Sequence, residues 1–405
     1  MNEDPSEDPT RVYRLVFGIA TALMMGLSWP LWVGPSELPR VPFVPSLPVL
    51  PHRLSWVLFV FFLGSLLWGA GAKRARVAWA IAGSLLAYLV LEDQHRFQPW
   101  AYQAIMTALA LSACHRRDAL VWPRCFLIAL YLHSGLSKLD VSFLHELGPM
   151  FLNAGLRIVR LDPAVLPERF RAALILAMPL TEIAIAAALS FVRTRRAGAW
   201  AAVLLHLTLV LLLGPLGLRH STIVLVWNAA VALEVLALFP RPAPEPRRGP
   251  IFVLMGVVFG AVALLPFTER LGWLDSWPSF ALYASHAERM EVLLSDEEAE
   301  RLEGRVRARL LPATGPGWRR LDLTAWSLQA RGTPAYPQNR AGVGLVLGLA
   351  RGLPESVSIR VVLLGRASPF SGRRSRREFT SIAELNSWAD QNRINARPRR
   401  DEEGR

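Results

Sequence analysis

A lysine near the end of an apolar segment is the side chain in this sequence best placed to do chemistry. Lys138 follows a mostly uncharged run. In a helix, Ser134 would lie on the same face as Lys138, and His133 and Asp140 would lie together on the adjacent face. A lysine buried at the edge of the apolar membrane core can lose its proton more readily, which would make it a base or an amine nucleophile. The alternative is an interfacial lysine whose ammonium group reaches toward lipid headgroups.

Several other ionisable side chains, Glu92, Arg96, Asp140 and Arg219 among them, gather at the same predicted ends of the apolar segments, and four more are candidate helpers of Lys138. These four are Asp93, His95, His133 and His220. Asp93 and His95 stand in a short polar run, and His220 follows a Gly-Pro-Leu-Gly break that ends another apolar segment. We therefore expect a site at one membrane boundary, with Lys138 as the catalytic base and these groups as its helpers.

Two further ionisable residues lie deep inside apolar segments. Glu182 and His206 are each about ten residues from the basic connector between their segments, roughly 14–17 Å at 1.5 Å per residue. Because these segments run antiparallel, a direct pair between the imidazole and the carboxylate is geometrically allowed. The pair would be either a polar clamp between helices or part of a proton path or site wall. Arg124 and Glu234 lie near the ends of their segments and are assigned no role.

The sequence carries no pattern for a metal site or a common cofactor. The histidines are scattered singly, and neither His-x-x-x-His nor Cys-x-x-Cys occurs. The two cysteines, Cys114 and Cys125, flank a basic connector and form no redox motif. P-loop, dinucleotide and Gly-x-Ser-x-Gly fingerprints are missing as well. We expect no metal, and the residues by themselves leave the cofactor unknown.

Apolar segments of membrane-crossing length dominate the first two thirds of the chain. Of the 405 residues, 52% are hydrophobic and 19% are charged, and the mean hydropathy is +0.30, which argues against an ordinary cytosolic enzyme. A bilayer core about 30 Å thick needs about 20 apolar residues in helix. By that criterion we expect about nine spans. Their predicted ranges are 15–33, 54–72, 77–91, 97–113, 119–138, 172–192, 197–218, 221–239 and 250–268.

Lysine and arginine are concentrated in alternate connectors between these spans. The connectors at 73–76, 115–117, 193–196 and 241–248 are basic, whereas the opposite short connectors hold few positive charges. The positive-inside rule then places the N-terminus in the cytoplasm and, after an odd number of spans, the C-terminal part on the outer face. We expect a multi-pass protein of the cell membrane.

The composition changes after the last predicted span. The later residues mix charged stretches with a strand pattern at 358–364 and a helix pattern at 382–394. We therefore expect an all-α transmembrane helix bundle followed by a small α/β domain. The predicted divisions are a disordered cytoplasmic tail over 1–14, the bundle over 15–268, the outer-face α/β domain over 269–395 and a disordered basic tail over 396–405. The net charge is +13, and the basic residues 373–377 and 397–400 are expected to lie near the anionic headgroups of the lipid bilayer, with no nucleic acid as partner.

The segment around Lys138 resembles a known family. The run Ser134-Gly135-Leu136-Ser137-Lys138-Leu139-Asp140, followed by Phe143, Leu147-Gly148 and Met150, is similar to the Ala-Gly-x-x-Lys-Leu segment of the HTTM superfamily, which contains the vitamin K-dependent γ-carboxylases. The resemblance implies that Lys138 deprotonates a reduced, quinone-type molecule. It also implies that His95, in Asp93-Gln94-His95-Arg96, is a functional histidine. The bundle is similar as well to DoxX- and MauE-type redox-associated membrane proteins, although the MauE thiol motif is missing.

Two functions stay open on these observations. The first is a membrane enzyme whose Lys138 acts on a lipid-soluble or quinone-like substrate at the outer boundary. The second is a non-catalytic scaffold or accessory subunit whose outer domain docks a membrane protein partner. The apolar run 277–283 is expected to be exposed in that case. A transporter is a weaker third function, supported only by Glu182 and His206.

Overall fold

The described part of the chain forms two compact units, each assembled from segments that are distant in sequence. Unit 1 comprises Met1–Leu27, Val60–Leu86 and Pro99–Ser285, and unit 2 comprises Ser28–Phe59, Ala87–Gln98 and His286–Arg405. The computed structural model describes residues 8–33, 38–48, 50–72, 75–115, 118–240, 249–302, 307, 309–312, 315–351 and 357–399. Parts of the predicted basic connectors and tails lie outside these residues, namely 1–7, 73–74, 116–117, 241–248 and 400–405.

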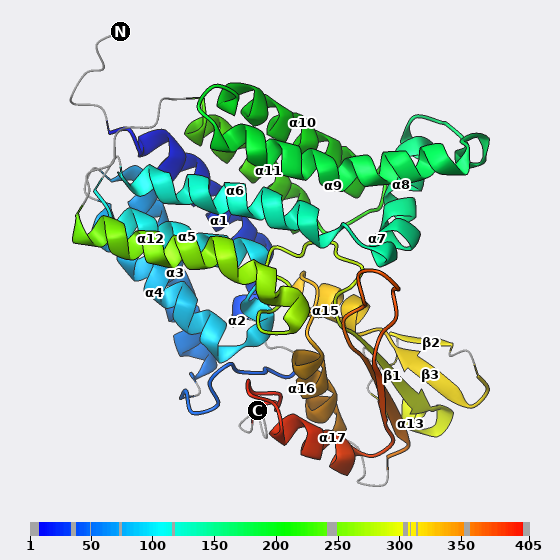
Figure 1. Ribbon diagram of the computed structural model, residues 1–405. Coiled ribbons are helices and arrows are strands. Elements are labelled where there is room, and N and C mark those ends of the chain that lie inside the picture. Colours follow the sequence, from blue (N-terminus) through cyan, green and yellow to red (C-terminus); the bar gives the residue numbers. More distant parts are fainter. Residues whose placement is uncertain are drawn as a thin grey trace. The chain divides into compact units, whose positions relative to one another are not determined.

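Each of the nine predicted apolar segments contains a helix (Figure 1). The helices are α1 Arg11–Leu27, α2 Trp29–Val33, α3 His52–Gly71, α4 Arg76–Glu92, α5 Pro99–Ala113, α6 Val121–Ser137, α9 Glu168–Ser190, α10 Arg195–Leu213, α11 Thr222–Leu238 and α12 Pro250–Leu264. The first predicted span is broken into α1 and α2. Pro30 explains the break, because proline lacks an N–H and fits only the first turn of a new helix.

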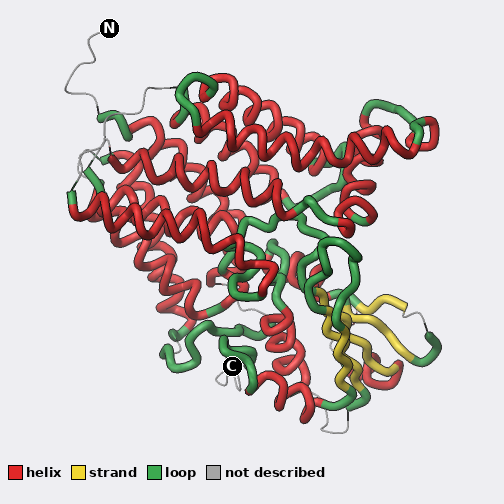
Figure 2. Tube along the Cα trace, in the orientation of Figure 1, coloured by secondary structure: helices red, strands yellow, loops and turns green. Residues whose placement is uncertain are grey.

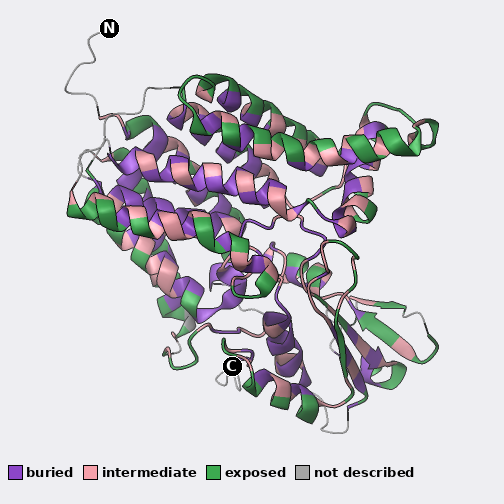
Figure 3. Ribbon diagram, viewed as in Figure 1, coloured by how far each residue is buried: buried purple, intermediate pink, exposed green. Residues whose placement is uncertain are grey.

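Five of the described helices are long and apolar enough to cross a membrane. They are Arg53–Gly71, Asp118–Ser137, Glu168–Ser190, Arg195–Leu213 and Pro250–Leu271. The helices α1, α4, α5 and α11 have 15 to 17 residues, which is short for a bilayer core of about 30 Å. The expected nine spans are therefore not confirmed. Figure 3 shows that α9, α10 and α12 expose long faces, whereas α6 is mostly enclosed.

Close packing of α6 against α9 is made possible by a glycine. In unit 1, α6 packs on α9, α9 on α10, and α10 on α11. A Cβ atom at Gly135 of α6 would lie 2.7 Å from the carbonyl oxygen of Pro179 and 2.7 Å from Cγ1 of Ile183, both on α9. These distances are too short for any side chain, so glycine is needed for the two backbones to approach.

Gly135→Ala is expected to lower the free energy of unfolding by about 1–3 kcal/mol, because the added methyl group meets backbone that cannot move aside freely. Gly260→Ala on α12 is the matched control, since a Cβ atom there meets nothing within 4 Å. Helix propensity alone makes that change neutral or stabilising by up to about 1 kcal/mol. Thermal unfolding in detergent compares the two. Equal melting temperatures would contradict the close contact.

Two short helices follow α6 and place an apolar face against the bundle. These are α7 Val141–His145 and α8 Leu147–Ile158. Asp140 begins α7 as its N-cap, accepting a hydrogen bond from the backbone N–H of Phe143 at 2.7 Å, and also pairs with Arg270 at 2.8 Å. Phe143 and Phe151 then pack into an apolar cluster of unit 1 with Ile175.

Unit 2 contains a small antiparallel sheet near the C-terminus, in the region where the sequence predicted a small α/β domain (Figure 2). Its order is β2-β3-β1-β4-β5, with β1 Arg289–Ser295, β2 Leu310–Pro312, β3 Trp318–Leu321, β4 Ile359–Leu364 and β5 Arg376–Phe379. The strand expected at 358–364 is β4, and the helix expected at 382–394 is α17, which ends earlier, at Asp390. The other helices are α13 Asp296–Arg301, α15 Leu323–Arg331 and α16 Asn339–Ala350.

One face of the sheet and the helix α16 form the core of unit 2. Buried and less buried side chains alternate along β1, as expected for a strand with one packed face, whereas β4 buries three residues in succession, Val361 to Leu363. Val292, Ile359 and Val361 belong to the same apolar cluster as Val343 and Val346 of α16. This cluster is what allows a sheet of short strands to be stable.

Segments from the first hundred residues complete unit 2. The backbone N–H of Gln94 donates to the carbonyl of Val41 at 2.8 Å, and its side-chain amide donates to the carbonyl of Asn395 at 2.6 Å. Arg399 donates from its backbone to Arg40 at 2.9 Å and is buried. Residues 396–399, expected in a disordered tail, are thus packed. At the other end, α1 begins at residue 11, inside the tail expected over 1–14.

Candidate functional site

Lys138 lies in a closed polar cluster at the C-terminal end of α6. Its ammonium group donates to the carbonyl oxygen of Ser134 at 2.9 Å and to the Ser134 hydroxyl at 2.7 Å. It also forms an ion pair with Glu182 of α9, with distances of 2.9 and 3.1 Å to the two carboxylate oxygens. Lys138 is 4% exposed. The helical spacing that predicted Ser134 and Lys138 to be neighbours is therefore correct.

The cluster around Lys138 holds an ammonium ion and leaves it little freedom. A lysine ammonium has three N–H donors, and three acceptor groups receive them here: the Ser134 carbonyl, the Ser134 hydroxyl and the Glu182 carboxylate. A base needs a nitrogen that the substrate can approach, and here protein acceptors occupy all three donor directions of the Lys138 nitrogen. The described geometry is that of a polar clamp joining α6 to α9.

The predicted pair between Glu182 and His206 is replaced by other partners. Glu182 binds Lys138, whereas His206 lies between Tyr131 and Asn228. The Tyr131 hydroxyl is 2.7 Å from Nε2 of His206, and Nδ1 of His206 is 2.9 Å from the Asn228 side-chain oxygen. The expectation was wrong because sequence gives the depth of a residue along its helix but not the direction in which the helix turns it.

The other two histidines expected near Lys138 have separate neighbours in unit 1. Nε2 of His133 lies 2.7 Å from the carbonyl oxygen of Ala263, so this histidine joins α6 to α12. His220 packs edge-on against Tyr283 with ring centroids 5.3 Å apart. Burial lowers the pKa of His220. Neither contact brings the imidazole to the Lys138 ammonium, whose described partners are Ser134 and Glu182.

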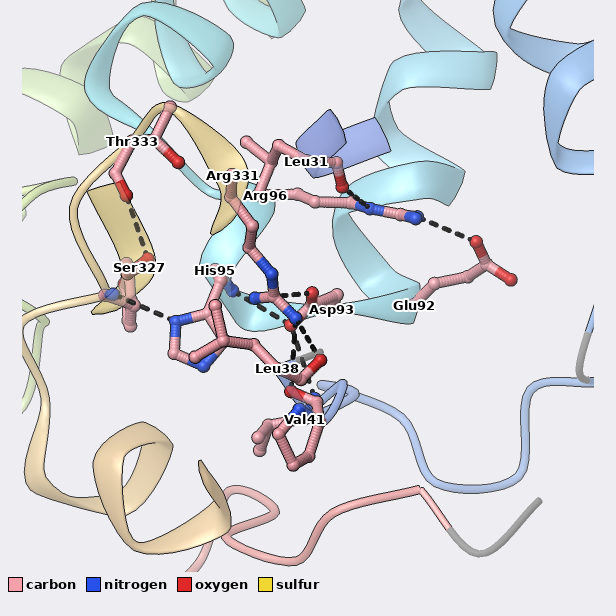
Figure 4. A network of polar contacts seen from close by, with 12 residues as sticks. Leu31, Leu38, Val41, Glu92, Asp93, His95, Arg96, Ser327, Arg331 and Thr333 are labelled. Atoms are coloured by element: carbon pink, nitrogen blue, oxygen red, sulfur yellow. Dashed lines mark hydrogen bonds and ion pairs between the residues drawn. The ribbon is translucent and has the colours of Figure 1, made fainter. Parts of the chain in front are cut away.

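Asp93 and His95 belong to a buried network of unit 2 (Figure 4). They lie on the short 3-10 turn Gln94–Arg96 and its cap, where the Asp93 carboxylate accepts from the backbone N–H of His95 at 3.2 Å. The same carboxylate pairs with Arg331 of α15 at 3.3 Å. Nδ1 of His95 accepts a hydrogen bond from the backbone N–H of Tyr336 at 3.0 Å. These bonds fix the imidazole in the tautomer that carries its proton on Nε2.

Arg96 is a second residue with many partners in this network; the sequence places it in the polar cluster but assigns it no catalytic role. Its guanidinium donates to the Glu92 carboxylate at 2.8 Å. It also donates to three backbone carbonyls, those of Leu31 at 3.0 Å, Trp32 at 2.7 Å and Leu89 at 3.1 Å. Arg96 and Glu92 are both fully buried. The fork of donors on one guanidinium thus ties α2 to the end of α4.

Burial controls the charge states in this network. It lowers the pKa of His95 to about 4, with the Asp93 carboxylate acting against the shift and Arg331 with it. Burial alone would raise the pKa of Asp93, but the charges of Arg331, His95 and Arg96 reverse this effect, and the pKa is lowered. At neutral pH the network therefore holds a neutral imidazole beside an ionised carboxylate.

The free energy of unfolding is expected to fall as the pH is lowered from about 6.5 to about 4, by up to about 3 kcal/mol from His95. Over this interval the unfolded chain binds a proton at His95 and the folded chain does not, so acid favours unfolding. Chemical denaturation across this range measures the slope. His95→Gln, which cannot titrate, is expected to show a weaker dependence of the free energy of unfolding on pH. An identical pH dependence in both proteins would contradict the role of His95.

One atom of the network has unused bonding capacity. Among the residues that the structure describes, no hydrogen-bond partner is found for Nε2 of His95, although the side chain is 1% exposed. A buried N–H without a partner costs about 1–3 kcal/mol. His95 therefore has one donor free for a water molecule or a small ligand, while its other nitrogen is held by Tyr336.

Among the described residues, the predicted site side chains belong to no metal-binding group and do not line the cavity described for unit 1. Within the described ranges, no group of three or more His, Cys, Asp or Glu side chains is placed to hold a metal ion. A cavity of about 320 Å³ in unit 1 is lined by Arg14, Arg76, Trp79, Cys114 and His115, and none of the predicted site residues lines it.

The apolar run 277–283, expected to be exposed, is largely buried. Phe280 is 2% exposed and packs against Tyr102 and Phe126 with ring centroids 5.9 and 5.0 Å apart. Phe280 and Tyr283 both adopt positive φ angles, of 57° and 53°, which are uncommon for aromatic residues. The run is a packed connection within unit 1, and its side chains are not available as a docking surface.

Sequence reasoning also missed a buried carboxyl group. Glu234, near the end of α11, was assigned no role, but it is 1% exposed and accepts hydrogen bonds from Gln103 and Tyr13. Its position one turn from the helix end suggested a side chain reaching water. The packing of α1 and α10 against α11 and the contact with Gln103 of α5 remove that route.

No protein-family model matches this sequence, and searches of curated proteins and of solved structures find no similar protein.

Proposed function

We propose that this chain is a multi-pass membrane protein that acts as a scaffold or accessory subunit. The observation that carries the proposal is the closed state of the Lys138 cluster, in which Ser134 and Glu182 take the donors of the ammonium group. A catalytic amine needs access to its substrate, whereas a helix clamp needs the enclosure seen here. The five helices of membrane-crossing length support placement in a bilayer.

The exposed face of the sheet in unit 2 supports a role in binding an acidic partner. Arg320 and Arg360 are each paired with Leu293 in the register of the sheet, so both project from the same face. Arg360 lies over the ring of Trp318, 4.8 Å from its centroid. Arg360 also pairs with Glu378 of β5 at 3.1 Å, so a carboxylate of the partner would be received mainly by Arg320. Reversal of both charges, Arg320→Glu with Arg360→Glu, is expected to remove a stoichiometric partner from the purified protein; retention would contradict this surface.

The proposed orientation has the N-terminus in the cytoplasm and unit 2 on the outer face. Single cysteines test it in a background with both natural cysteines replaced by alanine. Phe370→Cys lies in unit 2 at an 89% exposed position, and Val192→Cys lies beside a basic connector at a 77% exposed position. In intact cells, a membrane-impermeant maleimide is expected to label the first and to label the second only after permeabilisation. The opposite pattern would invert the topology.

A membrane enzyme is the second candidate. It is favoured by the position of Lys138, where the resemblance to the HTTM superfamily expects a base acting on a quinone-type molecule. In that case Glu182 would receive the proton of the lysine, since the two groups are 2.9 Å apart. A neutral amine would then face the substrate.

Exchange of the two charges separates the candidates. The double variant Lys138→Glu with Glu182→Lys keeps an ion pair between α6 and α9 but moves the amine to the other helix. A scaffold is expected to keep its partner and its stability to within about 1 kcal/mol, whereas an enzyme loses turnover. Lys138→Arg is the control, because it keeps the charge in place and removes the base.

A further inference from the structure

Glu234 is a buried carboxyl group surrounded by neutral hydrogen-bond partners in unit 1. One of its oxygens accepts from the side-chain amide of Gln103 at 2.8 Å and from the Tyr13 hydroxyl at 3.4 Å. The Gln103 oxygen accepts in turn from the indole N–H of Trp227 at 2.8 Å, and the Tyr13 hydroxyl lies 3.3 Å from the Thr107 hydroxyl. Side chains of α1, α5 and α11 thus enclose the carboxyl group.

The cations on the neighbouring helices are engaged elsewhere. Arg14 on α1 pairs with Asp8 at 2.9 Å, and Arg124 on α6 donates to the carbonyl of Leu238 at 2.8 Å. His206 on α10 lies between Tyr131 and Asn228, with one ring nitrogen donating and the other accepting. Among the residues that the structure describes, none forms an ion pair with Glu234.

Glu182 in the same unit provides the opposite case. Its carboxylate faces the ammonium of Lys138 at 2.9 Å, which compensates a buried negative charge. Glu234 is more deeply buried and has only neutral donors. An isolated carboxylate in such surroundings costs far more than the neutral acid, because neutral dipoles replace only part of its hydration.

We infer that Glu234 is a proton-binding site in the helix bundle and carries a neutral carboxylic acid at pH 7, enclosed by Gln103, Tyr13 and Trp227. The ligand of this site is a proton, taken up and released between α1, α5 and α11. Protonatable acids held among helices in this way are the elements from which membrane proton relays are built. The inference does not depend on the role of Lys138.

Infrared spectroscopy of the purified protein tests the inference, because a protonated carboxyl group and a carboxylate absorb in different regions. The difference between the unmodified protein and Glu234→Gln at pH 7 is expected to show the loss of one carbonyl band of a protonated acid. The matched difference for Glu182→Gln is expected to show the loss of carboxylate bands. A carboxylate signature for Glu234 would overturn the inference.

Stability provides an independent measurement with the same pair of variants. Glutamine is a neutral replacement for a protonated glutamic acid, so Glu234→Gln is expected to leave the melting temperature at pH 7 nearly unchanged. Glu182→Gln is expected to lower it clearly, because Lys138 is left without its partner. If Glu234→Gln does not fold, the unmodified protein alone provides the test. The infrared band of the unmodified protein, followed as the pH is raised, then still shows whether a buried acid titrates above neutral pH.

Discussion

Lys138→Met is expected to lower the free energy of unfolding by about 3 kcal/mol, because it leaves the Glu182 carboxylate, whose side chain is only 13% exposed, without a positive partner. The loss of stability would come mainly from the unpaired charge of Glu182 and only partly from the missing hydrogen bonds to Ser134. Thermal unfolding in detergent and the yield of folded protein are the measurements.

Removal of both charges is the control for this prediction. The double variant Lys138→Met with Glu182→Leu leaves no buried ion, and replacement of a buried pair by apolar residues is often neutral. We expect the double variant to recover most of the stability that Lys138→Met loses. If it is as unstable as the single variant, the lysine stabilises the protein through packing and not through its pairing with Glu182.

Arg96→Lys is expected to lower the free energy of unfolding by about 4 kcal/mol or more, although it keeps the charge. The Arg96 guanidinium reaches three backbone carbonyls and the Glu92 carboxylate at once. A lysine ammonium is a compact point charge with three donors and cannot span four separated acceptors. Each buried acceptor left without a donor costs about 1–3 kcal/mol.

Arg301→Lys on α13 is the matched control for Arg96→Lys. Arg301 also pairs with glutamates, but its side chain is 44% exposed. Pairs at such positions contribute about 0–1 kcal/mol, so the substitution is expected to have almost no effect. Similar losses for both variants would show that the Arg96 network does not stabilise unit 2 beyond an ordinary surface pair.

Apolar periodicity was sufficient to locate the helices and part of the sheet. Uncharged runs such as 250–268 can hardly form anything except helices in a chain of this composition, and α12 starts at Pro250, a residue favoured in the first turn. The strand β4 was recognisable from the β-branched run Ile359–Leu364. The number of membrane crossings was not recognisable in the same way, because several helices fall just below the needed length.

The partners of the polar side chains were much harder to predict. Spacing along one helix correctly joined Ser134 to Lys138, because residues four apart face the same side. The partner on the next helix, Glu182, depends on how α9 is rotated, and its Pro179 changes the local geometry. The position of Glu234 near the end of α11 suggested a side chain in contact with water. Its actual partners, Gln103 and Tyr13, come from helices far away in the sequence.

Unit 2 is assembled from three segments that are distant in sequence, so it can be completed only late in synthesis. Gln94 meets Asn395, and Arg399 bonds to Arg40, so early and late residues share one core. During synthesis at about 5–20 residues per second, the segment around Arg96 must wait several tens of seconds for its last neighbours to leave the ribosome. Over that time its buried charges are without their final environment. The nascent chain is therefore expected to need a chaperone or the insertion machinery to protect this segment until translation ends.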